Sequence, residues 1–211
     1  MTKYIAIAAI VIMFFSSCEN QSPEARFWTW FEENQDEIYH FERDQERVFD
    51  RLQEEMSKVH PDLTFEFGPE EDGKREFVIS ADGIIEAFPA VEALYSSAPS
   101  LPRWTIIKFR PRRPAMTIEI GQLKLEPSDI QVSIEPDGEK AGLTVFVKDL
   151  DQSRSDQYKQ AAFIMLDQAI GEYDMETKVG FIGLQPFESN SDQERHSLDE
   201  LPQRFDDFLR H

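Results

Sequence analysis

The spacing of hydrophobic residues along the chain switches from a helical period to a strand period. Over 27–59, apolar side chains recur every three, four or seven residues, which places them on one stripe of a long helix. Pro61 ends this pattern, because a proline disfavours helical geometry in the residue before it. Residues 63–67 then alternate apolar and polar, and 75–80 return as a second strand after a turn, which predicts a hairpin.

The rest of the chain repeats one order of elements, in which a helix and a strand follow each hairpin. After the first hairpin we expect a helix over 84–98 and a strand over 104–109. The corresponding later segments are strands over 130–134 and 143–147, a helix over 155–173 and a strand over 178–184. We interpret this as an internal duplication of a ββαβ unit. We expect the two units to share one antiparallel sheet with both helices on one face.

These elements predict the α+β fold class, with a long N-terminal helix, the two ββαβ units and a short C-terminal helix. The last helix is expected because Ser197 and Glu200 match a capping box in front of an amphipathic run. We expect four segments, namely a signal peptide, a tether, a single α+β domain, and a polar linker with the C-terminal helix. Their boundaries are 1–17, 18–26, 27–187 and 188–211.

The N-terminal residues have the pattern of a targeting signal. The uncharged run 4–15 spans only about 18 Å as a helix, which is too short for a bilayer core of about 30 Å. Phe15-Ser16-Ser17-Cys18 follows and resembles the lipobox of bacterial lipoproteins. In that family the signal peptidase cuts before the cysteine, whose thiol carries a diacylglycerol, so the resemblance implies lipid attachment at Cys18. The alternative is an ordinary secretory signal beside an unrelated cysteine.

Lipidation at Cys18 predicts a protein of the cell envelope that is anchored to a membrane without spanning it. The residue after the cysteine is Glu19 and not aspartate. In Gram-negative lipoproteins this favours the outer membrane over the inner membrane, as the resemblance implies. The membrane is therefore one expected partner, reached through the lipid anchor.

Charge and composition exclude several classes of function. Acidic residues number 41 and basic residues 22, which gives a net charge of -19 that would repel a nucleic acid. Cys18 is the only cysteine, so a disulfide framework and a cysteine-rich zinc site are excluded. The four histidines lack ligand spacing, and no catalytic or nucleotide-binding motif occurs. We therefore expect no metal and no cofactor, and assign no catalytic residue.

Basic residues are concentrated in one short segment of this acidic chain. Five of them lie within the eleven positions 103–113, namely Arg103, Lys108, Arg110, Arg112 and Arg113. Arginine binds carboxylates and phosphates in bidentate geometry, so this segment is a candidate site for an anion or a partner. The alternative is a structural role, in which these side chains pair with the acids Glu66, Glu76, Asp82 or Glu119.

Two carboxylates are weaker candidates for chemistry. Asp82 precedes Gly83 at a strand-to-helix junction, where we expect it to cap the following helix. A catalytic role for Asp82 or Glu66 beside Arg110 is the alternative, and it requires a concave pocket that holds these side chains.

The body of the chain, about 28–187, resembles an uncharacterised family of bacterial proteins. The residues that carry this resemblance are Trp28, Trp30, Phe31, Phe65, Phe67, Gly68, Pro69, Ile79, Asp82, Gly83, Ala87, Pro89, Val91, Lys108, Arg110 and Arg112. The resemblance implies an α+β domain and transfers no activity.

The preferred interpretation is a cell-envelope lipoprotein that binds a protein or an anionic small molecule without catalysis. Two alternatives stay open. One is a hydrolase-like enzyme that uses carboxylates near Arg110. The other is an acidic inhibitor or immunity-type protein, whose negative charge neutralises a basic partner.

Overall fold

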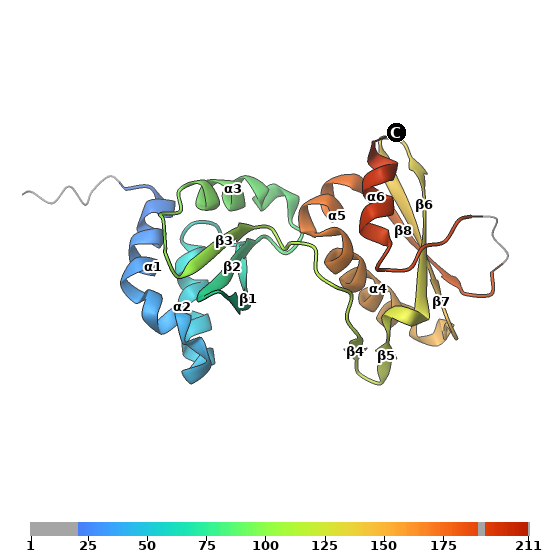
Figure 1. Ribbon diagram of the computed structural model, residues 1–211, viewed down its shortest axis with the longest axis horizontal. Helices are drawn as coiled ribbons and strands as arrows, with labels where there is room; N and C mark the ends of the chain where they lie inside the picture. Colours follow the sequence, from blue (N-terminus) through green and yellow to red (C-terminus); the bar gives the residue numbers. More distant parts are fainter. Residues whose placement is uncertain (1–20, 190–192, 211) are drawn as a thin grey trace, which may run out of the picture.

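The computed structural model describes residues 21–189 and 193–210, which form two lobes joined by one segment (Figure 1). The first lobe contains α1 (Pro23–Tyr39), α2 (Gln45–Ser57), β1 (Thr64–Glu71), β2 (Lys74–Ser80), α3 (Phe88–Ser96) and β3 (Trp104–Lys108). The second contains β4 (Ile118–Ile120), β5 (Leu123–Leu125), β6 (Ile130–Asp137), β7 (Lys140–Val147), α4 (Ser155–Ile170), α5 (Glu172–Lys178), β8 (Val179–Pro186) and α6 (Leu201–Leu209). The predicted α+β fold class is confirmed.

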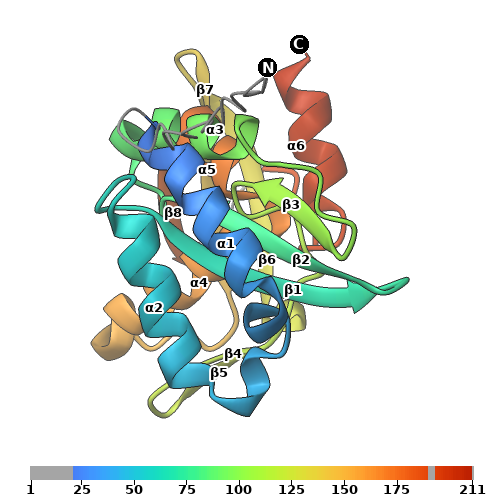
Figure 2. The same cartoon turned by 90° about the vertical axis from the view of Figure 1, so that its left-hand side faces the viewer.

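The expected long N-terminal helix is wrong in one respect, because it is broken in two. α1 ends at Tyr39, and a short 3₁₀ turn over Phe41–Arg43 leads into α2. The break lets α2 turn back beside α1 on the same face of the first sheet (Figure 2). One straight helix over 27–59 would be about 50 Å long and would overhang the lobe. α1 also begins earlier than predicted, since Ser22 caps it and 23–26 of the expected tether are helical.

The predicted apolar stripe forms the core of the first lobe. Phe31 and Leu52 are fully buried, and the ring centroid of Phe31 lies 5.1 Å from that of Phe77 on β2. The indole of Trp28 donates a hydrogen bond of 2.8 Å to the carbonyl of Leu94, which ties α1 to α3. The three helices of this lobe therefore pack into one apolar layer over its sheet.

The ββαβ order occurs twice, as predicted, but the single shared sheet is wrong. β1-β2-β3 and β6-β7-β8 are separate three-stranded sheets, and β4 and β5 pair as a small third sheet. In each large sheet the first two strands are antiparallel, whereas the third lies parallel to the second. A helical crossover returns the chain in the same direction, which makes that last pair parallel and the sheet mixed. The buried apolar clusters of the two lobes share no residue.

The backbone has the same unusual turn after the second strand of both ββαβ units. Asp82 is the second residue after β2, and Asp149 is the second residue after β7. Both have left-handed backbone geometry, with φ of 51° and 49°. Aspartate is among the few residues that tolerate this region, because its short side chain can form local hydrogen bonds. The same sharp turn therefore leaves the second strand of each unit.

The C-terminal residues include the predicted helix, α6, which packs against the second lobe. Ser197 and Glu200 exchange the hydrogen bonds expected of a capping box, with the Ser197 N–H donating to the Glu200 carboxylate at 3.0 Å. They close a turn in front of α6, whose N-cap is Glu200 and has no side-chain cap. Leu201 and Phe205 of α6 are fully buried in the second cluster. His196 forms an antiparallel bridge with Val132 on β6, so the expected polar linker also contacts the sheet edge.

The targeting signal lies outside the described residues, and so does Cys18. Within 21–189 and 193–210, no helix combines the length and the hydrophobicity needed to cross a bilayer.

Candidate functional site

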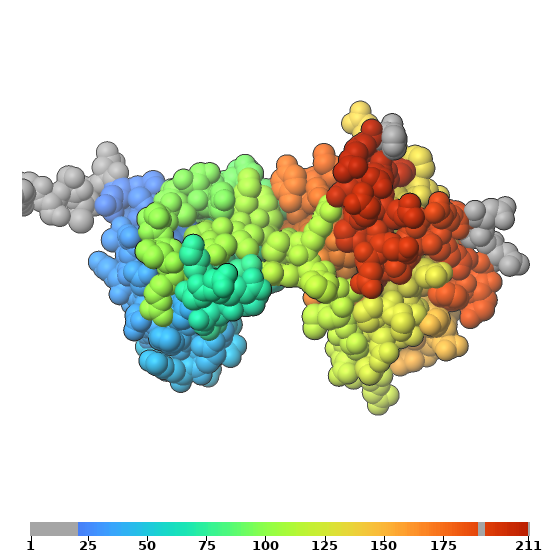
Figure 3. Space-filling view, viewed as in Figure 1, coloured from blue at the N-terminus to red at the C-terminus, as the bar shows by residue number. Residues whose placement is uncertain are grey.

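The predicted site residues other than Arg103 and Cys18 lie where the two lobes meet. After β3 the chain runs from Phe109 to Thr117 without regular structure, and Figure 3 shows a narrow waist between the lobes at this segment. Phe109 has left-handed backbone geometry, with φ of 61°, which turns the chain out of β3 and across the junction. Arg110, Arg112 and Arg113 therefore lie between the lobes.

Arg110 joins the first sheet to α4. Its guanidinium donates to both carboxylate oxygens of Asp167, at 2.9 and 3.4 Å, and to Asp82 at 2.9 Å and the Ser80 hydroxyl at 3.1 Å. The side chain is only 17% exposed. Burial alone lowers the pKa of Arg110, but the hydrogen bonds and charge of Asp167, with the charges of Glu172 and Asp82, raise it overall. The guanidinium therefore stays charged and holds the lobes together.

Glu172 forms the second connection and has no exposed surface. One carboxylate oxygen accepts from the N–H groups of Ala81 and Gly83 at 3.0 and 3.1 Å, and the other from that of Arg110 at 2.9 Å. Gly171 lets this side chain reach the turn after β2. Its φ is 86°, and a Cβ there would lie 3.3 Å from the carbonyl oxygen of Arg110.

All five predicted basic residues have a carboxylate partner. Lys108 pairs with Glu92 at 2.8 Å, and Arg103 with Asp36 at 3.0 Å on the far side of the first lobe. Arg112 binds Asp206 at 2.7 Å and Asp174 at 3.0 Å, while Arg113 pairs with Glu76. The hydrogen bond to Asp206 contributes most to the raised pKa of Arg112. The geometry thus favours the structural interpretation of this segment.

Three of the four acids that we expected as structural partners are found there, and one is not. Glu66, Glu76 and Asp82 pair with Arg110 or Arg113. Glu119 lies instead in the β4–β5 hairpin, opposite Lys124. Sequence reasoning missed the acids of the second lobe, namely Asp167, Glu172, Asp174 and Asp206. Gly171 was the only local sign of a special turn, and it did not indicate which distant groups Glu172 would bind.

Glu66 and Asp82 face the same cavity. It has a volume of about 270 Å³ and is lined by both residues, by Arg110 and Arg113, and by α4. Asp82 does not cap a helix as expected, since α3 begins only at Phe88 and its N-terminus has no side-chain cap. Burial raises the pKa of Glu66 and outweighs the opposing charge of Arg110, with Asp167 and Glu172 adding to the rise. The concave pocket required for a catalytic carboxylate is therefore present.

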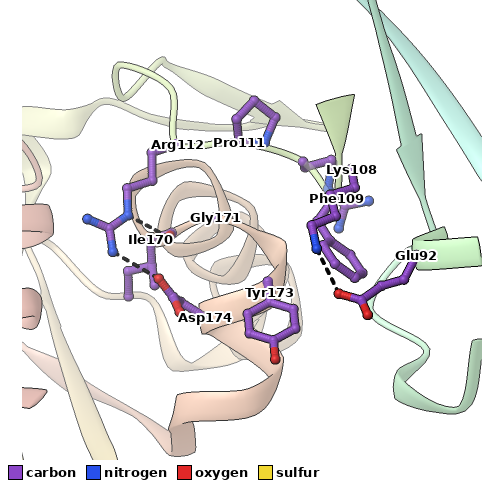
Figure 4. Close-up of a pocket in the computed structure, with 10 residues that line it drawn as sticks. Glu92, Lys108, Phe109, Pro111, Arg112, Ile170, Gly171, Tyr173 and Asp174 are labelled. Atoms are coloured by element: carbon purple, nitrogen blue, oxygen red, sulfur yellow. Dashed lines mark hydrogen bonds and ion pairs between the residues drawn. The ribbon is translucent and has the colours of Figure 1, made fainter. Parts of the chain in front are cut away.

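A larger cavity of about 510 Å³, here called the junction pocket, lies beside the linking segment (Figure 4). The first lobe contributes Glu92, Lys108 and Phe109, and the second contributes Ile170, Gly171, Tyr173 and Asp174, with Arg110, Pro111 and Arg112 between them. Tyr173 is 45% exposed, and its ring centroid lies 5.1 Å from that of Phe109. Three of the five predicted basic residues thus line one pocket.

No cluster suited to a metal ion, with three or more His, Cys, Asp or Glu side chains, occurs in the described part of the chain. Compared with protein-family models, curated proteins and solved structures, the chain has no significant match to any of them.

The raised pKa of Glu66 predicts a pH-dependent difference in stability. A carboxyl whose pKa is raised on folding adds stability at low pH, and this is lost as the pH rises through the raised value. Glu66→Gln is neutral at every pH, so it should melt above the wild type at neutral pH and level with it below about pH 4. Thermal melts from about pH 3 to pH 8 test this, with Glu71→Gln on the exposed hairpin as control. A variant that melts below the wild type at neutral pH contradicts the prediction.

Proposed function

We propose that the protein is a lipid-tethered, non-catalytic binding module of the cell envelope, and that its ligand binds in the junction pocket. One observation carries the proposal, namely that both lobes line this pocket and that Tyr173, which is 45% exposed, presents its aromatic ring there. Ligand sites are typically concave, largely apolar and supplied with a few polar groups that fix orientation. The junction pocket is concave and combines apolar side chains with charged groups from both lobes.

The polar groups around the junction support binding rather than catalysis. Arg110 and Glu172 are largely buried charged residues of the junction, and they use their hydrogen bonds to hold the turn after β2 and α4 in place. A general acid or base must instead reach substrate with a transferable proton. These two side chains therefore act as structural supports beneath the pocket.

Substitution of Tyr173 tests the proposed site. Tyr173→Ala removes the exposed ring, and we expect about tenfold weaker retention of the ligand from a cell-envelope extract. Phe163→Ala is the matched control, because Phe163 is 39% exposed on α4 and lines the other cavity. Extract components retained by immobilised protein can be quantified by mass spectrometry. Equal retention by the wild type and both variants would exclude the junction pocket as the site.

The tether has a separate test. Cys18→Ala removes the predicted acceptor thiol, so we expect incorporation of labelled palmitate to be lost and the protein to leave the membrane fraction. Replacing Ser16 with alanine keeps the thiol and serves as the control. Undiminished labelling of the Cys18→Ala protein contradicts the lipoprotein prediction.

A hydrolase is the second candidate function, and the cavity shared by Glu66, Asp82 and Arg110 favours it. Its carboxylates would act as acid and base, with the raised pKa of Glu66 suited to holding a proton. Hydrolysis of a panel of ester, amide and glycoside substrates that is abolished by Glu66→Gln would support this function over the binding module.

A further inference from the structure

The charges at the junction pocket are already balanced in pairs. Lys108 and Glu92 form one ion pair at 2.8 Å, and Arg112 and Asp174 form another at 3.0 Å. Figure 4 shows these pairs on opposite sides of the pocket, with Tyr173 between them. A free anion would approach each cation against the repulsion of its carboxylate partner, so the pocket does not favour a charged ligand.

The same pairs leave hydrogen-bonding capacity of both kinds. Lys108 has three ammonium hydrogens, of which Glu92 takes one. Among the described contacts, no donor reaches the second carboxylate oxygen of Glu92, the second oxygen of Asp174 or the hydroxyl of Tyr173. Both a donor group and several acceptor atoms thus have unused capacity among the described residues of the pocket. They suit a ligand whose polar groups both donate and accept, as hydroxyl groups do.

The floor between the pairs is a supported aromatic ring. Tyr173 packs against Phe109 and, with centroids 5.8 Å apart, against Phe88. Two rings behind it restrict its motion, yet it stays 45% exposed. An exposed aromatic face held in this way offers apolar contact at little further entropic cost.

We propose that the junction pocket binds an uncharged saccharide ring that lies on Tyr173. A pyranose has an apolar face of C–H groups and a rim of hydroxyls, which match the ring and the two flanking ion pairs. The volume of about 510 Å³ lies within the range of about 300–1,000 Å³ typical of small-ligand sites. This inference rests on the proposed function and names the ligand class for the same pocket.

The test compares the binding of neutral sugars with that of anions. Saturation-transfer NMR and calorimetry are run on the full chain, in a detergent without a sugar headgroup. The probes are glucose, N-acetylglucosamine, cellobiose and N,N′-diacetylchitobiose, with glucuronate and inorganic phosphate as anions. We expect at least one neutral sugar to bind more tightly than both anions, and Tyr173→Ala to weaken it about tenfold while Phe163→Ala does not.

The outcomes separate this inference from the proposed function. Tighter Tyr173-dependent binding of glucuronate or phosphate overturns the inference that the ligand is an uncharged saccharide but keeps the pocket as a binding site. Neutral sugars that bind equally well to Tyr173→Ala, or none that binds below about 10 mM, also overturn the inference. The proposed function itself is overturned by a different result, namely that the wild type and Tyr173→Ala retain the same components of the envelope extract equally well.

Discussion

Glu172→Ala is expected to destabilise the protein by about 3–5 kcal/mol, one of the two largest effects of a single substitution at the junction. The carboxylate has no exposed surface and accepts three backbone hydrogen bonds, from Ala81, Gly83 and Arg110. Each buried N–H left without a partner costs about 1–3 kcal/mol, and water entering the gap recovers part of this. Urea denaturation followed by circular dichroism measures the loss.

The same substitution should loosen one lobe from the other, because their apolar cores are separate. We therefore expect earlier proteolytic cleavage in the linking segment 109–117 and a denaturation curve that splits into two transitions. Glu176→Ala is the matched control on the same helix. Burial raises the pKa of Glu176, so removing its charge at neutral pH should not destabilise the fold. If both variants unfold alike, Glu172 does not hold the lobes.

The contribution of Glu172 shows where prediction from the sequence stops. The helices and hairpins were predictable because hydrophobic period and turn residues act over a few positions. Glu172 lies 91 residues from Ala81, and no local pattern records that contact. The formation of two separate sheets could not be predicted either. It depends on which strand edges and helix faces meet after each unit has formed, and these contacts join residues far apart in the sequence.

Only some of the partners of the arginine segment could be predicted, because partners far away in the sequence leave no local pattern. Glu66 and Glu76 were expected as partners because a neighbouring hairpin strand brings them near. Asp167 and Asp206 come from helices 57 and 94 residues further along the chain. The sequence thus left open whether the positive charge was free. In the structure, carboxylates of the second lobe pair with Arg110 and Arg112. The candidate anion site is therefore a set of ion pairs that supports the pocket.

Arg110→Ala tests the structural role of the arginine segment most directly. We expect this substitution to lower the free energy of unfolding by about 3–5 kcal/mol. The substitution leaves Asp167, whose side chain is only 10% exposed, as a buried charge without its bidentate partner. Arg110→Ala combined with Asp167→Ala removes both charges, so we expect the double variant to be more stable than Arg110→Ala alone. Denaturation of the four proteins in this cycle measures the coupling.

The exposed basic residues of the segment should contribute much less to stability than Arg110. The side chains of Arg103 and Lys108 are each 43% exposed, and their replacement with alanine should change stability by less than about 1 kcal/mol. If the segment served to bind anions, Arg110→Ala would instead abolish anion binding and leave the stability of the fold unchanged. Because Arg110 joins Ser80 and Asp82 to Asp167, we expect its loss to weaken the contact between the lobes.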